Sequence, residues 1–60
     1  MDIMTLIAAG KVWTLTCKDG RNVFRATEEE ARRWFTLNRY TVVAVTDPEG
    51  EDGWDRMVEG

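Results

Sequence analysis

The dipeptide Asp19-Gly20 constrains the fold of this chain more than any other feature of its sequence. It separates two runs of β-favouring residues, 11–17 and 22–26, in which apolar and polar side chains largely alternate. Asp-Gly between such runs predicts a β-hairpin closed by a type I′ turn, whose two central residues both need positive φ. That turn would pair Leu15 with Phe24 and gather the large apolar groups on one face. The expected face consists of Trp13, Leu15, Cys17, Phe24 and Ala26.

A helix is predicted to follow the hairpin, from Glu28 to about Leu37. Thr27 and Glu30 have the spacing of a capping box, in which each side chain satisfies a backbone amide of the first turn. The three glutamates 28–30 also lie at the positive end of the helix dipole. Asn38 is expected to end the helix in a left-handed conformation. Two pairs of opposite charge are expected along the exposed side, Glu28 with Arg32 and Glu29 with Arg33.

Residues 40–46 predict a third strand, and their apolar character on both faces suits a strand that is well covered. The helix must carry the chain back across the sheet, which favours a β-β-α-β arrangement with the helix over one face. We therefore predict a small α+β fold with an antiparallel three-stranded sheet in the order second, first, third. Trp13, Leu15 and Phe24 are expected to pack beneath Trp34 and Phe35 of the helix.

The two ends of the chain leave alternatives open. Residues 2–9 fit either a short helix stopped by Gly10 or a strand at the sheet edge. Residues 47–50 predict a turn, and the apolar residues beyond it suit either one turn of helix or a short edge strand. We interpret residues 1–60 as a single domain, with a body at 11–46 and an acidic C-terminal segment at 47–60.

The side chains that most catalytic sites require are missing from the sequence. It contains no histidine and no serine, so no Ser-His or Cys-His nucleophile pair can form. Cys17 is the single cysteine and is expected to be a small buried hydrophobe. The acidic residues from Asp47 onward begin like a calcium-binding loop, but Asp52 and Val58 stand where the required glycine and glutamate would be. We therefore expect no enzyme activity, no catalytic residues, no cofactor and no metal site.

Charge is distributed unevenly along the chain. The whole sequence carries a net charge of −3, whereas residues 47–60 contain six acidic residues and one arginine. Clustered carboxylates on a compact body can imitate the phosphates of duplex DNA, which carries one charge per about 1.7 Å of axis. An acidic tail that only keeps the chain soluble is the alternative. The residues expected to bind a partner are Glu28, Glu29, Glu49, Glu51, Asp52, Trp54 and Asp55.

Trp54 belongs to this set because it lies in an acidic, glycine-flanked segment outside the predicted sheet. An aromatic side chain rimmed by charge is typical of a binding hot spot. The competing interpretation is that Trp54 folds back and closes an open edge of the small core.

The order of elements resembles that of small phage-encoded inhibitors. The resemblance covers roughly residues 11–46 and is carried by a pattern of short motifs rather than by one diagnostic sequence. These are Lys11-Val12-Trp13-Thr14, Asp19-Gly20, the helix start at 27–31, Trp34-Phe35 and the strand at 42–45. The layout is similar to anti-CRISPR proteins and to the phage inhibitor of bacterial RNA polymerase. The resemblance implies a protein that blocks a nucleic-acid-processing complex without chemistry of its own, and it assigns no residue roles.

The function predicted from the sequence is thus a non-enzymatic, anti-CRISPR-like inhibitor. It would bind a protein partner, such as a CRISPR effector complex, by acidic DNA mimicry or by masking a subunit. The alternatives are a phage inhibitor of host RNA polymerase, a homodimeric assembly module that buries Trp54 between protomers, and a small nucleic-acid-binding domain that uses the arginines. In the favoured interpretation the chain is cytoplasmic, a monomer or homodimer, and binds neither nucleic acid nor membrane directly.

Overall fold

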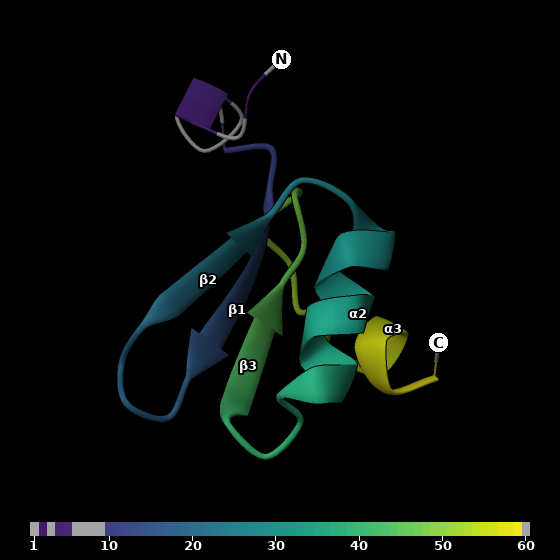
Figure 1. The fold of residues 1–60 in the computed structure, drawn as a ribbon. Helices are drawn as coiled ribbons and strands as arrows, with labels where there is room; N and C mark the ends of the chain where they lie inside the picture. The colour runs from purple at the N-terminus through teal and green to yellow at the C-terminus, as the bar shows by residue number, and fades with distance from the viewer. Residues whose placement is uncertain (1, 3, 6–9, 60) are drawn as a thin grey trace.

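The computed structural model describes residues 2, 4, 5 and 10–59. Its elements follow the order β1 (Trp13–Cys17), β2 (Asn22–Arg25), α2 (Glu28–Leu37), β3 (Val42–Thr46) and α3 (Trp54–Glu59). The three strands form an antiparallel sheet in the order β2-β1-β3, and α2 packs across one face of it with α3 alongside (Figure 1). The predicted α+β class, the strand order and the helix on one face are confirmed.

The hairpin of β1 and β2 forms as predicted, but its register is shifted by one residue. Leu15 pairs with Val23, and Phe24 pairs with Thr14 on the opposite face. The expected type I′ turn is wrong because Asp19 does not adopt positive φ, whereas Gly20 does, at 93°. The turn is held by bonds from Gly20 N to Cys17 O (2.9 Å) and from Cys17 N to Arg21 O (2.8 Å). It therefore contains three residues, 18–20, with the glycine in the position that favours a bulge.

The shifted register changes which side chains of the hairpin enter the core. Val23 and Arg25 share the helix-covered face with Trp13 and Leu15, whereas Phe24 and Ala26 were expected there. Val23 packs against the core cluster, and Phe24 is half-buried on the other side of the sheet. A shift of one residue exchanges the two faces because side chains alternate along a strand.

Helix α2 has the predicted bounds. The Thr27 side chain accepts a hydrogen bond from Glu30 N at 3.2 Å, which satisfies one amide of the first turn. Both predicted ion pairs form, from Arg32 to Glu28 at 2.9 Å and from Arg33 to Glu29 at 3.1 Å, although the first is half-buried. The helix buries Ala31 and Phe35 against the sheet.

The left-handed exit predicted for Asn38 is wrong. Its backbone has φ −126° and ψ 31°, and its N–H bonds back to the carbonyls of Trp34 and Phe35. The Asn38 side chain also donates to the Trp34 carbonyl at 3.0 Å. These bonds satisfy the end of the helix without a residue of positive φ.

Strand β3 begins two residues later than expected and is less covered than its composition suggested. Tyr40 lies outside the strand and is 92% exposed, and Val43 is 57% exposed. The register between β1 and β3 shifts at Thr16/Cys17, which leaves Val43 as the extra residue of a bulge. Val42 and Val45 remain in the core, so the bulge is what lets two valines that are three residues apart point inward.

The core lies between the sheet and the two helices. Its buried side chains are Trp13, Leu15, Ala31, Phe35, Val42, Val45 and Met57. Met57 comes from α3, so the acidic C-terminal segment contributes directly to the core. Of the two alternatives for this segment, the helix is the one that occurs, because Trp54, Met57 and Val58 all lie in α3; Asp52, just before them, forms an isolated β-bridge with Thr46.

The alternatives for residues 2–9 fall mainly outside the described residues. Among those described, the Asp2 carboxylate accepts hydrogen bonds from the backbone N–H and the hydroxyl of Thr5, both at 2.9 Å. The backbone bond lowers the pKa of Asp2 below its ordinary value. Within the described part of the chain, neither helix has the length and apolar character needed to cross a membrane.

Candidate partner-binding surface

The acidic segment is anchored to the body by Asp47. This carboxylate is 8% exposed, and its Oδ1 accepts hydrogen bonds from the N–H groups of Glu49 and Glu51, both at 2.9 Å. The predicted turn at 47–50 is present, closed by Gly50 N to Asp47 O at 2.9 Å. A buried acceptor that satisfies two backbone donors fixes the path of the loop, so Asp47 has a structural role rather than a binding one.

The chain then runs back along the outer edge of β3. Asp47 N donates to Glu51 O at 2.8 Å, and Gly53 N donates to Val45 O at 2.9 Å. Gly53 passes so close to Trp13 that a Cβ placed on it would lie 2.6 Å from Trp13 Cζ3. The absence of a side chain at Gly53 is therefore what allows the segment to lie against the core.

Arg56 connects α3 to the start of α2. Its guanidinium bonds to Glu28 Oε1, lies 3.6 Å from Asp47 Oδ2 and stacks over Trp13 at 4.8 Å from the ring centroid. Arg32 also reaches this group, donating to Glu28 and to the Arg56 carbonyl at 3.3 Å. Glu28 is thus shared by two arginines, and the cluster holds the two helices together.

The predicted site residues therefore separate into two groups. Glu28 and Glu29 are engaged by arginines of the same chain. Apart from Asp47, the acidic residues of the loop and α3 are exposed, and within the described residues none of them forms an ion pair. This second group is Glu49, Glu51, Asp52 and Asp55, and together with Glu59 at the end of α3 it forms what we call the acidic edge.

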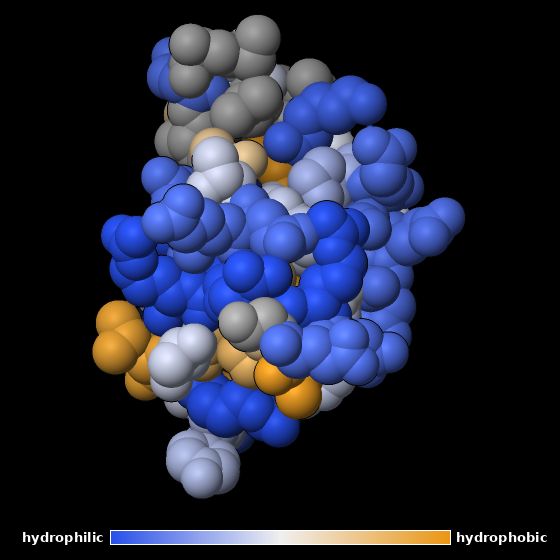
Figure 2. Space-filling view, turned by 90° about the vertical axis from the view of Figure 1, so that its right-hand side faces the viewer, coloured by the Kyte–Doolittle hydropathy of each residue, from blue (hydrophilic) through white to orange (hydrophobic). Residues whose placement is uncertain are grey.

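The acidic edge is ordered by its own backbone contacts. Asp52 Oδ1 accepts a hydrogen bond from Trp54 N at 2.9 Å, at the start of α3. Figure 2 shows the side of the molecule that carries α2 and α3, on which hydrophilic side chains predominate and hydrophobic ones form only small areas. Among the residues described, no three Asp, Glu, Cys or His side chains gather in a way that could hold a metal ion.

Trp54 packs on the body and remains half-exposed. Its ring meets Phe35 edge to face, with centroids 5.2 Å apart and planes at 88°. The Arg39 guanidinium lies 4.8 Å from the Trp54 centroid and 5.2 Å from the Phe35 centroid. Trp54 thus closes one edge of the core, as the competing interpretation proposed, and a part of it is still accessible.

An open hollow of about 490 Å³ runs between β3 and the acidic edge. Strand residues supply one wall, and Glu51, Asp52 and Trp54 supply the other. The full lining is Val43, Ala44, Val45, Thr46, Gly50, Glu51, Asp52 and Trp54. Three of the sequence-predicted binding residues therefore meet at one place, together with strand residues that sequence reasoning did not select.

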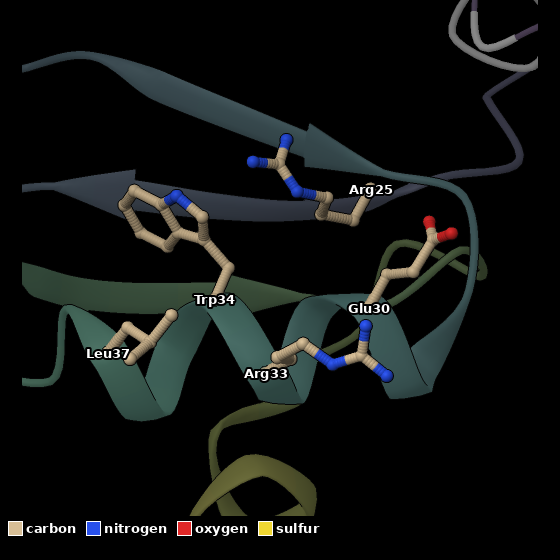
Figure 3. A pocket seen from close by; sticks show the side chains of 5 residues that line it. All are labelled: Arg25, Glu30, Arg33, Trp34 and Leu37. Atoms are coloured by element: carbon tan, nitrogen blue, oxygen red, sulfur yellow. The ribbon is translucent and has the colours of Figure 1, made fainter.

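A second hollow, of about 400 Å³, lies between β2 and α2 (Figure 3). Glu30, Arg33, Trp34 and Leu37 line it from the helix, and Arg25 faces Trp34 from the strand, with its guanidinium 5.9 Å from the ring centroid. Sequence reasoning assigned Trp34 wholly to the core and missed this groove. The i, i+3, i+4, i+7 spacing of 30, 33, 34 and 37 was the signal that these side chains share a second helix face.

Comparisons of the chain with protein-family models, with curated proteins and with solved structures find no match.

Proposed function

We propose that this chain is a non-enzymatic binding protein that presents its acidic edge to a basic surface on another protein. The observation that carries this proposal is the division among the carboxylates. Glu28 and Glu29 at the start of α2 are neutralised by arginines, whereas the carboxylates of the acidic edge are exposed and without an ion pair among the described residues. Carboxylates that only kept the chain soluble would not need fixed positions, whereas these lie on a loop whose path is fixed by hydrogen bonds to Asp47.

The anchoring favours binding over a diffuse charge effect. Asp47, the bridge between Thr46 and Asp52, and buried Met57 all fix the segment against the body. A surface that is ordered before binding loses less conformational entropy when a partner docks. Complementary charge also accelerates the encounter, and this acceleration weakens as salt screens the charges over about 8 Å at physiological ionic strength.

A groove that binds nucleic acid is the kind of basic surface that fits. Such grooves carry arginine and lysine side chains spaced to meet phosphates, and ordered carboxylates can occupy the same positions. The resemblance to phage inhibitors suggests the same class of target, for which the chain would act as an anti-CRISPR-like inhibitor by DNA mimicry. Bacterial RNA polymerase is the second target that the resemblance suggests.

The proposal is tested by charge reversal on the acidic edge. Purified CRISPR effector complexes and bacterial RNA polymerase are titrated with the parent and with a variant carrying lysine at 49, 51, 52 and 55. We expect the parent to bind and inhibit one of these enzymes in a strongly salt-dependent manner, and the variant to lose both effects. The matched control carries lysine at exposed Glu29 and Glu30, outside the acidic edge, and it is compared with a variant that carries lysine at 51 and 52 only, because these two variants have the same net charge.

Circular dichroism establishes that each variant is folded before binding is compared. If the reversed variant binds and inhibits as well as the parent, acidic mimicry is wrong. If the control variant loses binding to the same extent, the effect reflects net charge and the acidic edge has no specific role.

A further inference from the structure

The hollow beside β3 combines apolar and acidic residues. Val43, which is 57% exposed, lies on the wall formed by the strand, and Trp54, which is half-exposed, lies on the other wall. Glu51 and Asp52 lie at the same hollow with no ion pair among the described residues. The hollow therefore offers contacts to a group with an apolar stem and a positively charged end.

The edge of β3 is poorly suited to receive a whole strand. Val45 O already accepts from Gly53 N, and Asp47 N already donates to Glu51 O. Nearer the N-terminal end of β3, the bulge at Val43 interrupts the regular spacing of backbone groups that a pairing strand requires. The occupant that fits is a side chain entering the hollow, not a strand added to the sheet.

We propose that this hollow receives an arginine side chain of the partner. The inference rests on the proposed function and specifies it further. It names one partner side chain that enters the hollow, in addition to the general attraction between the acidic edge and a basic surface. The methylene stem of arginine covers Val43 and the accessible part of Trp54, and the planar guanidinium meets Glu51 and Asp52 through its several N–H donors. Lysine carries the same charge without the planar set of donors, so it fits less well.

The chain already contains a contact of the proposed kind. The guanidinium of Arg39 lies 4.8 Å from the centroid of Trp54 and 5.2 Å from that of Phe35. Arg39 itself does not line the hollow. Stacking of a guanidinium on an indole is favourable because the ring face carries negative charge density.

The inference is tested with blocked tripeptides, without any need for the natural partner. The intact chain, labelled with ¹⁵N, is titrated with acetyl-Gly-Arg-Gly-amide, with its lysine counterpart and with its uncharged citrulline counterpart. We expect saturable shifts at the amides of β3 and at the Trp54 indole, with the arginine peptide binding tightest. Glu51→Gln or Asp52→Asn should each weaken its binding about two- to fivefold, the range of a partly exposed ion pair.

Asp52→Asn keeps a side-chain oxygen that can accept from Trp54 N, so this variant tests charge without removing the helix contact. Glu30→Gln is the matched control, because Glu30 is exposed, lies outside the acidic edge and does not line the hollow. The inference is overturned if the citrulline peptide binds equally well or if the shifts occur elsewhere. It is also overturned if the shifts appear without peptide as the protein concentration rises, because a second copy would then fill the hollow.

The two proposals fail in different ways. If reversal of the acidic edge abolishes partner binding while Glu51→Gln and Asp52→Asn change neither peptide nor partner binding, the proposed function stands and the inserted arginine is wrong. If the arginine peptide binds in the hollow but no nucleic-acid-processing enzyme is bound, the recognition of arginine stands and the proposed partner class is wrong.

Discussion

At the scale of single residues, Gly53 is the position where an added methyl group should have the clearest cost. Its Cβ would lie 2.6 Å from Trp13 Cζ3 and 3.3 Å from Val45 Cγ1, and Trp13 is only 3% exposed. Gly53→Ala should therefore lower the free energy of unfolding by about 1–3 kcal/mol, the usual cost of overpacking a core. Urea unfolding followed by fluorescence measures this change.

The clash can be separated from a backbone effect by a double-mutant cycle. Trp13→Leu removes the ring that the new methyl group would meet, at the cost of lost packing. If the clash is the cause, the double variant should be at least about 0.5 kcal/mol more stable than the two single changes predict by addition. Strict additivity would show that contact with the ring is not what makes glycine necessary.

The two carboxylate oxygens of Asp47 have different partners, which allows a second test at this scale. Oδ1 accepts from backbone N–H groups of the loop, and Oδ2 faces Arg56. Asp47→Ala removes the acceptor of two backbone N–H groups and should cost about 1–3 kcal/mol. Asp47→Asn can keep an acceptor oxygen and loses only the charge that faces Arg56 at 3.6 Å. Chemical denaturation should therefore rank alanine as clearly more destabilising, and equal losses would mean that the ion pair dominates.

Asp19 predicts a pH effect at the hairpin turn. Its carboxylate accepts from Arg21 N at 3.0 Å and from Arg21 Nε at 2.8 Å, and the backbone bond is the main cause of its lowered pKa. A pKa lowered by folding adds stability above the ordinary value of 3.8 and loses it as the pH falls through the folded value. Carboxyl NMR titration should give a midpoint below 3.8, and Asp19→Asn should flatten the pH dependence of stability there.

At the scale of elements, α2 was predictable because its signals are local. Thr27 fixes the start of the helix by accepting a hydrogen bond from Glu30 N, which is one of the two bonds of the predicted capping box. The hairpin was predictable as an element but not in register, because Asp-Gly also suits a three-residue turn. The Asp19 carboxylate accepts a hydrogen bond from the backbone N–H of Arg21, two residues further on, which favours that turn. Since both Val23 and Phe24 are apolar, the face pattern could not distinguish the two registers.

The position of the acidic segment could not be predicted, because it depends on contacts between residues that are far apart in the sequence. Nothing near Asp47 indicates that its carboxylate is buried, or that Gly53 lies against Trp13 of the first strand. The ion pair between Arg56 and Glu28 joins residues 28 positions apart. Local patterns identified the charged residues and Trp54 as candidates, but only the packed fold shows which carboxylates are engaged internally and which surround the hollow.

At the scale of the whole molecule, both outer edges of the sheet are protected against pairing with another chain. On β2, the Arg25 guanidinium donates to the carbonyl of Phe24 at 2.7 Å. On β3, residues 51–53 cover the C-terminal half of the edge, and the bulge at Val43 interrupts the regular backbone spacing in the N-terminal half. Such devices reduce edge-to-edge association, which would otherwise join small sheets. The same protection weighs against the alternative of a homodimer built through strand edges.

We therefore expect the parent chain to be a monomer at micromolar concentration in sedimentation equilibrium. Arg25→Ala should promote self-association because it exposes the Phe24 carbonyl on the short outer edge of β2. Arg33→Ala is the matched control, since it removes the same charge from the same groove. The Arg33 side chain donates to Glu29, so its loss exposes no strand carbonyl. Stronger association in the Arg25 variant alone would show that one backbone contact keeps the edge closed. A dimeric parent would show that the sheet edges are not protected, and equal association in both variants would place the self-contact outside the β2 edge.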